Sequence, residues 1–239
     1  MKKNRLREML LLALIMLIGV ACTKDDPEPF KAYCDVFQVN RMIASETAGH
    51  ALAYFVYGQQ PIKSATVLRS GDVDPIVLNE IPNTFSFGKE PVESDYDTTV
   101  VAAGEFIFNI VPETGEAVND SDYFSPQNLE IPEIIEVTWP STGPDMPVIK
   151  WDGTTNADFV VVKIKDSEGK YIYSTKKLSP SINSFTTNAV DGSFIVQPEK
   201  EGIYTIEVQS FLVEENINVS YAQFNIEELS IGEWEVVWP

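Results

Sequence analysis

Cysteine and histidine are scarce in this sequence, which has two cysteines and one histidine among 239 residues. The usual cysteine and histidine sets of a zinc site cannot be completed from them without several carboxylates. The sequence also lacks a GxGxxG fingerprint behind a candidate strand, a Walker loop and a G-x-S-x-G elbow. We therefore expect no cofactor, no metal site and no enzyme activity.

Basic residues are also few, with 17 Lys and Arg against 36 Asp and Glu. Removing residues 1–22, which hold four basic residues and one acidic residue, leaves 13 basic and 35 acidic residues and a net charge of −22. Nucleic-acid binding depends on clustered Lys and Arg, so a nucleic-acid partner is excluded. Attachment to an anionic membrane surface by charge alone is excluded for the same reason.

Long stretches with apolar residues at helical spacing are missing, and apolar residues recur mostly with a period of two. Gly, Pro, Asn, Asp and Ser interrupt these runs at short intervals, as is typical of turns between strands. The sequence predicts an all-β protein built of two tandem β-sandwiches. The candidate strands are 31–39, 51–57, 62–68, 84–88, 105–111, 133–139, 147–151, 158–166, 170–175, 183–187, 193–197, 203–213, 219–229 and 233–238.

Residues 1–21 have the three parts of a secretory signal peptide: a basic start, the apolar run Met9–Ala21 and small residues at its end. As a helix this run spans about 20 Å, too short for a hydrocarbon core of about 30 Å. "LIGVAC" resembles a bacterial lipobox, in which Cys22 becomes the lipidated first residue of the mature chain. Gly19 departs from that pattern, which usually has Leu, Val or Ile there. The alternative is an ordinary signal peptide followed by an incidental cysteine.

Lys24, Asp25 and Asp26 follow closely behind Cys22. They resemble the lipoprotein export signal of the Bacteroidota, a lysine followed by acidic residues, which routes lipoproteins to the outer face of the outer membrane. The resemblance implies a protein held in the outer membrane by acyl chains such as palmitate and facing the extracellular side. Residues 22–30 then form a lipidated tether, and the same residues also suit a plain charged spacer.

Three pairs of glycines recur in the same order in the two halves of the mature chain. Their offsets are 98, 98 and 95 positions for Gly104 and Gly202, Gly71 and Gly169, and Gly58 and Gly153. Such spacing is typical of an internal repeat. It favours a duplicated sandwich, with residues 31–128 as one domain, residues 129–239 as the other, and the proline-marked stretch 125–133 as the joint.

The second half is the more recognisable. "PVIKWDGTTNADFVVVKIKDSEGKYIYST" and "GIYTIEVQSF" resemble a fibronectin type III or related Ig-like sandwich, which implies that Trp151 is the core tryptophan and that Tyr204 has a tyrosine-corner role. The first half resembles the Ig-like modules near the anchor of Bacteroidota surface lipoproteins, including those of the starch-utilisation type. These motifs are generic, so they imply a fold and not a binding site.

Cys34 and His50 are the two reactive side chains of the mature chain besides Cys22. Once Cys22 carries lipid, Cys34 has no disulfide partner within the chain, and we expect it to be buried in the first strand; a reactive thiol is the alternative. His50 has neither a serine elbow nor a cysteine beside it, so we favour a strand-edge histidine over the base of a catalytic triad.

Two acidic loops, 119–122 and 152–158, have oxygen ligands spaced two residues apart, as calcium requires. Neither matches the EF-hand pattern, and turn formation by Asp and Asn explains both more simply. At the other end of the chain, Trp234, Val236 and Trp238 fall on one strand face. We expect that face to be buried against a sandwich, with a sugar-stacking platform as the alternative.

The favoured function is that of a non-catalytic surface lipoprotein whose tandem sandwiches bind or position an extracellular glycan or protein. The alternative is a structural or assembly subunit that uses an edge strand or loops. A hydrolase is the third hypothesis, because the two carboxylates of a glycosidase can lie far apart in sequence. The sequence does not identify the ligand-binding residues.

Overall fold

The computed structural model describes residues 29–140, 146–187, 192–215 and 225–239. Strands dominate these ranges, and the short 3-10 helix η1 (Glu93–Asp95) lies among them, so the predicted all-β class is confirmed. Within the same ranges, no helix has the length and apolar character that a membrane span requires.

The strands fall into an N-terminal and a C-terminal set. The N-terminal set is β1 (Ala32–Ala44), β2 (Thr47–Gly58), β3 (Ile62–Arg69), β4 (Ile76–Val77), β5 (Asn79–Ile81), β6 (Ser86–Lys89), β7 (Gly104–Pro112) and β8 (Val118–Phe124). The C-terminal set is β9 (Glu133–Thr138), β10 (Val148–Asp152), β11 (Phe159–Lys165), β12 (Tyr171–Thr175), β13 (Ser184–Thr186), β14 (Gly192–Phe194), β15 (Ile203–Val213) and β16 (Ile226–Val237).

One nine-stranded sheet runs through both sets of strands, in the order β14-β12-β11-β15-β16-β1-β2-β6-β5. The sets meet where β1 pairs with β16 in parallel, over Gln38–Arg41 and Glu228–Ile231. Two smaller sheets, β13-β10-β9 and β4-β3-β7-β8, pack on it. The halves therefore share a sheet as well as the chain between them, and the domain limits 31–128 and 129–239 stay predictions.

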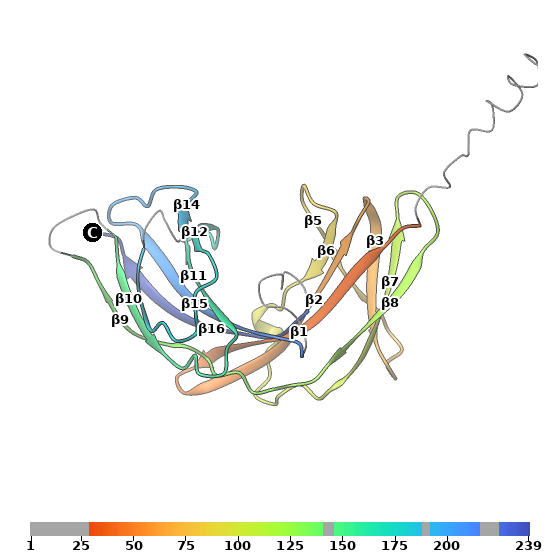
Figure 1. The fold of residues 1–239 in the computed structure, drawn as a ribbon, viewed down its shortest axis with the longest axis horizontal. Coiled ribbons are helices and arrows are strands. Elements are labelled where there is room, and N and C mark those ends of the chain that lie inside the picture. The colour runs from red at the N-terminus through yellow and green to blue at the C-terminus, as the bar shows by residue number, and fades with distance from the viewer. Residues whose placement is uncertain (1–28, 141–145, 188–191, 216–224) are drawn as a thin grey trace, which may run out of the picture.

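Two large apolar clusters lie on the same face of the nine-stranded sheet. The N-terminal cluster includes Val36, Phe106 and Phe108, and the C-terminal one includes Trp151 and Ile206. In Figure 1 the sheet is curved around β1 and β16, with β7 and β8 outside one half and β9 and β10 outside the other. The smaller sheets thus cover the outer face of the large sheet and leave its inner face for other contacts.

A row of buried polar residues separates the two apolar clusters; we call Gln38, Asn40, Glu228 and Ser230 the polar seam. Glu228 accepts hydrogen bonds from the backbone N–H groups of Gln127, Asn128 and Leu129 at 2.6, 3.1 and 2.6 Å. Asn40 donates to Glu228 at 3.3 Å and to Ser230 at 3.0 Å. The seam therefore ties β1, β16 and the predicted joint together.

The strand predictions missed β4, β5 and β8 and placed a false break within β16. Residues 118–124 form β8 although their side chains are mostly polar, because β8 pairs with β7 throughout and faces solvent on one side. Residues 219–229 and 233–238 were predicted as two strands. Residues 219–224 lie outside the described part of the chain, and Ile226–Val237 forms one strand, β16. Gly232 lies inside it because the carbonyl of Pro132 packs where a side chain would begin.

The expected places of Trp151 and Tyr204 are confirmed. Trp151 is fully buried in the C-terminal cluster, and Tyr204 is buried beside it. The Tyr204 hydroxyl accepts a hydrogen bond from the backbone N–H of Glu199 at 2.7 Å. A tyrosine that bonds to the backbone a few residues upstream is the contact that defines a tyrosine corner.

Candidate functional site

The residues of the expected lipid anchor and export signal, Cys22, Lys24, Asp25 and Asp26, lie outside the described residues. Their roles stay predictions. The described residues include the other two reactive side chains of the mature chain, those of Cys34 and His50.

Cys34 is a free, buried cysteine on β1, as expected. Burial, followed by the charge and hydrogen bond of Asp120, raises the pKa of its thiol well above the usual range. A thiol reacts as the thiolate, so this cysteine is held in its unreactive form.

His50 lies on β2 beyond the reach of β6, which pairs with β2 only over Tyr54–Tyr57. Its backbone pairs instead with that of Asp97, through hydrogen bonds of 2.8 and 3.1 Å. Its Nδ1 lies 2.7 Å from Oδ1 of Asn40, so this ring nitrogen contacts an amide and not a nucleophilic hydroxyl or thiol. This position agrees with the expected strand-edge histidine.

The two acidic loops have different structures. Residues 119–122 belong to β8, so the turn expected there was wrong. In 152–158 the backbone N–H of Ala157 bonds to the carbonyl of Thr154 at 3.2 Å, which closes a turn. There the Asp158 carboxylate accepts a hydrogen bond from the N–H of Val213 at 2.9 Å and fixes the end of β15.

The two C-terminal tryptophans, Trp234 and Trp238, differ in burial. Val236 and Trp238 are buried, and the Trp238 ring meets those of Trp139 and Tyr204 edge to face at centroid distances of 6.0 and 5.6 Å. Trp234 is 41% exposed, so the expected burial of all three residues was wrong for this one. A single exposed ring is too small for the sugar-stacking platform considered above.

A cleft of about 240 Å³ lies on the inner face of the large sheet, where the two halves meet; we call it the inner cleft. Alternate residues of β1, β15 and β16 form its floor, because successive side chains of a strand point to opposite faces of the sheet. Glu90, Pro91 and Tyr96 line it from the N-terminal half, and Tyr171 lines it from β12. The lining residues are Phe37, Val39, Arg41, Ala53, Glu90, Pro91, Tyr96, Lys163, Lys165, Tyr171, Glu207, Gln209, Phe211, Leu229, Ile231 and Glu233.

Glu207 is the centre of a charged network in the inner cleft. It is fully buried, forms an ion pair with Lys165, and accepts hydrogen bonds from the Tyr171 hydroxyl at 3.0 Å and from Nε2 of Gln209 at 2.6 Å. Burial and then the charge of Glu207 raise the pKa of Tyr171 to about 12. Burial lowers the pKa of Lys163, whose ammonium lies 4.5 Å from the centre of the Tyr171 ring.

The opposite wall of the inner cleft has a second aromatic and cationic pair. Arg41 lies over the Tyr96 ring, 5.3 Å from its centre, and forms an ion pair of 3.4 Å with Glu233. Oε1 of Gln209 and Nε of Arg41 are buried and have no hydrogen-bond partner among the described residues. The cleft thus combines aromatic rings with donors, acceptors and charges of both signs.

A larger hollow of about 640 Å³ lies near the polar seam, with Gln38, Asn40 and His50 in its lining. These groups are already engaged, since Oε1 of Gln38 accepts a hydrogen bond from the N–H of Val101 at 3.0 Å and Asn40 bonds within the seam. The inner cleft is therefore the better candidate site.

Sequence reasoning did not find the inner cleft. Lys163, Lys165, Glu207 and Gln209 are polar residues at alternate positions of two strands that it did predict. A polar face on an otherwise apolar strand was the available signal. Comparison of the chain with protein-family models and with curated proteins finds no match.

Proposed function

We propose that this protein is a non-catalytic surface lipoprotein, attached through Cys22 and carried to the outer face of the outer membrane by Lys24, Asp25 and Asp26, that binds an extracellular glycan in the inner cleft. The observation that carries the proposal is the composition of that cleft. Tyr96 and Tyr171 bring two aromatic rings to the cleft, and the apolar face of a sugar can stack on such a ring where it displaces the cation that now lies over it. The charged and amide groups between them can bond to hydroxyls.

The size and charge of the inner cleft also favour part of a glycan. Its volume of about 240 Å³ lies just below the range of about 300–1,000 Å³ for drug-sized ligands, so it suits one end of a chain. Positive and negative side chains line it together, which favours a neutral polar ligand over an ion of either sign.

The alternatives have less support. An assembly subunit needs a free strand edge. The edge strands of the large sheet, β14 and β5, have only three residues each, which leaves β8 and β9 of the smaller sheets as the longer edges. A hydrolase needs a carboxylate that can take or give a proton. In the inner cleft, Glu207 is already bound to Lys165, Tyr171 and Gln209, so it is not free to act on a substrate.

Binding can be tested with the full chain in detergent, by screening immobilised glycans and measuring affinity by calorimetry. We expect Tyr96→Ala to weaken binding at least tenfold. Tyr123→Ala is the matched control, because it removes an exposed tyrosine of β8 that does not line the cleft. If no glycan binds, or if both variants bind as the wild type does, the cleft is not the glycan site.

The anchor needs its own test in cells. Cys22→Ser should abolish labelling by a fatty-acid analogue and release the protein or leave it uncleaved. Changing Lys24, Asp25 and Asp26 together to Ala should keep the label but remove the protein from the reach of antibodies on intact cells. Labelling that persists in Cys22→Ser would contradict the proposed attachment.

A further inference from the structure

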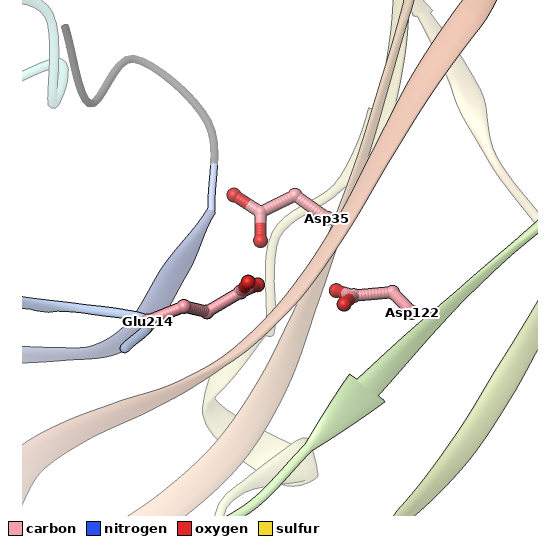
Figure 2. A group of neighbouring side chains, drawn as sticks. All are labelled: Asp35, Asp122 and Glu214. Carbon is pink, nitrogen blue, oxygen red and sulfur yellow. The ribbon is translucent and has the colours of Figure 1, made fainter. Parts of the chain in front are cut away.

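Asp35, Asp122 and Glu214 form a group of carboxylates at the junction of three strands; we call it the acidic cluster. One oxygen of each lies within 4.8 Å of the others. Asp35 is on β1, Asp122 is on β8, and Glu214 directly follows β15. Figure 2 shows the three carboxyl groups turned toward one another from these three directions.

The cluster forms where β1 leaves its parallel partner. Pairing with β16 begins at Gln38, so the preceding residues of β1 have no strand on that side. The carboxylate of Asp122 accepts a hydrogen bond from the N–H of Val36 at 2.7 Å, in the place of a strand neighbour. Oδ2 of Asp35 accepts one from the N–H of Ile226 at 3.2 Å, which connects β1 to the start of β16.

The second oxygen of Asp35 points to a missing ligand. The Asp35 side chain is only 2% exposed, and its Oδ1 is buried without a hydrogen-bond partner among the described residues. Figure 2 shows one oxygen of this carboxyl group turned toward Glu214 and Asp122. Buried polar atoms in folded proteins nearly always have a partner, so an unpaired carboxylate oxygen aimed at two other carboxylates needs one.

The surroundings of the cluster are negative. Burial raises the pKa of all three groups. Asp122 and Glu214 raise that of Asp35 further, Asp120 that of Asp122, and Asp122 that of Glu214, while a hydrogen bond with Glu214 lowers that of Asp122. The charges that act on them come from one another and from Asp120. Like charges this close are unfavourable unless a cation or a proton lies between them.

We propose that the acidic cluster is a calcium site. Carboxylate oxygens are the ligands that calcium prefers, and it takes six to eight oxygen ligands in a flexible arrangement, so water can complete the set. A bound ion would neutralise three buried charges and give Oδ1 of Asp35 its partner. It would also connect β1 and β8 of the N-terminal half to the end of β15 in the C-terminal half.

A shared proton is the competing explanation, because protonation of one carboxyl group also relieves the repulsion. The two explanations differ in their response to calcium at neutral pH. A calcium site binds the ion with one defined stoichiometry and is lost with one ligand. A proton-sharing cluster binds no calcium beyond the weak attraction of an acidic surface.

The test uses the full chain in detergent, stripped with EDTA and titrated with calcium chloride by calorimetry at physiological salt with magnesium present. We expect one calcium per chain with a Kd of about 10⁻⁴ to 10⁻³ M, in the range of extracellular modules. Thermal unfolding at saturating calcium should shift upward by about 5 °C. The wild type failing to bind calcium would overturn the proposal.

Glu214→Gln should weaken calcium binding at least tenfold and remove the thermal shift. Glu215→Gln is the matched control, since it removes the same charge at the next residue, whose side chain is exposed; its affinity should stay within about twofold of the wild type. Melting in EDTA checks the fold, because Glu214→Gln removes repulsion and should be at least as stable as the wild type. Equal affinity in the two variants would mean that calcium binds elsewhere.

Discussion

Glu207 and Asp35 are both buried carboxylates on strands of the large sheet, but their surroundings differ. Glu207 has a lysine, a tyrosine and a glutamine as partners. Asp35 has the backbone N–H groups of Ile226 and Asn225 as partners, and the charged groups around it are other carboxylates. The charge of Glu207 is balanced by Lys165, whereas that of Asp35 needs a cation or a proton from solution. A buried carboxylate therefore points to a ligand site only when the protein leaves one of its oxygens without a partner and gives it no cation.

The largest expected loss of stability comes from breaking the ion pair between Lys165 and Glu207. Lys165→Met should destabilise the protein by about 3 kcal/mol, because it leaves the fully buried Glu207 without its cation. The urea midpoint of unfolding measures this. Adding Glu207→Gln to Lys165→Met should restore most of the loss, since the double variant has no unpaired charge. A single variant as stable as the wild type would show that Lys163 replaces Lys165.

Glu228 is a third buried carboxylate, and it is stabilised by hydrogen bonds instead of an ion pair. Glu228→Gln keeps one acceptor oxygen and places an amide donor against donors from Leu129 and Asn40. We expect a loss of about 2 kcal/mol in the free energy of unfolding, because buried N–H groups lose their acceptor. Faster hydrogen exchange at Leu129, whose N–H loses its acceptor, should accompany it. Unchanged exchange there would contradict the role of Glu228 in fixing the joint.

These sites differ in how far the sequence could predict them. Alternation predicted 203–213 as a strand with the same limits as β15. It missed β8, whose polar residues pair with β7 instead of facing a core. It also gave no indication that β1 and β16 pair in parallel, because strand order is set by contacts between distant segments.

The acidic cluster could not be found from spacing, since Asp35, Asp122 and Glu214 come from three distant parts of the chain. One signal was present: Asp35 shares a strand face with the apolar and aromatic residues Tyr33, Phe37 and Val39 in a strand that was predicted to be buried. A charged residue on such a face predicts an unusual partner, although it does not name one.

The pH dependence of stability should show the effect of Glu227, a buried carboxylate near the acidic cluster. Burial raises the pKa of Glu227 to about 7, and Glu214, Asp122 and Glu228 add to the rise. The folded protein thus holds a proton that the unfolded chain releases near pH 4.5, so stability is lost as pH rises from about 4.5 to about 7.

Without calcium, we expect the free energy of unfolding to fall by about 1 kcal/mol over this range, after allowance for solvent screening. Urea titrations at several pH values measure it. Glu227→Gln keeps an acceptor for the N–H of Ser125 and should make the fall smaller, with the remainder coming from Asp35, Asp122 and Glu214. A wild type that gains stability toward pH 7 would contradict the raised pKa.

The smallest expected change in stability is that of Asp35→Asn, and its sign should depend on calcium. In EDTA, Asp35→Asn should stabilise the protein by about 1 kcal/mol, because it removes a charge repelled by Asp122 and Glu214 while its amide oxygen still accepts the N–H of Ile226. In saturating calcium the same variant should be less stable than the wild type, because it has lost a ligand. Asp74→Asn, in an exposed turn, should change stability by less than about 0.5 kcal/mol under both conditions. If Asp35→Asn destabilises the protein equally with and without calcium, the Asp35 side chain is a structural acceptor only, and it needs no ligand from solution any more than Glu207 does.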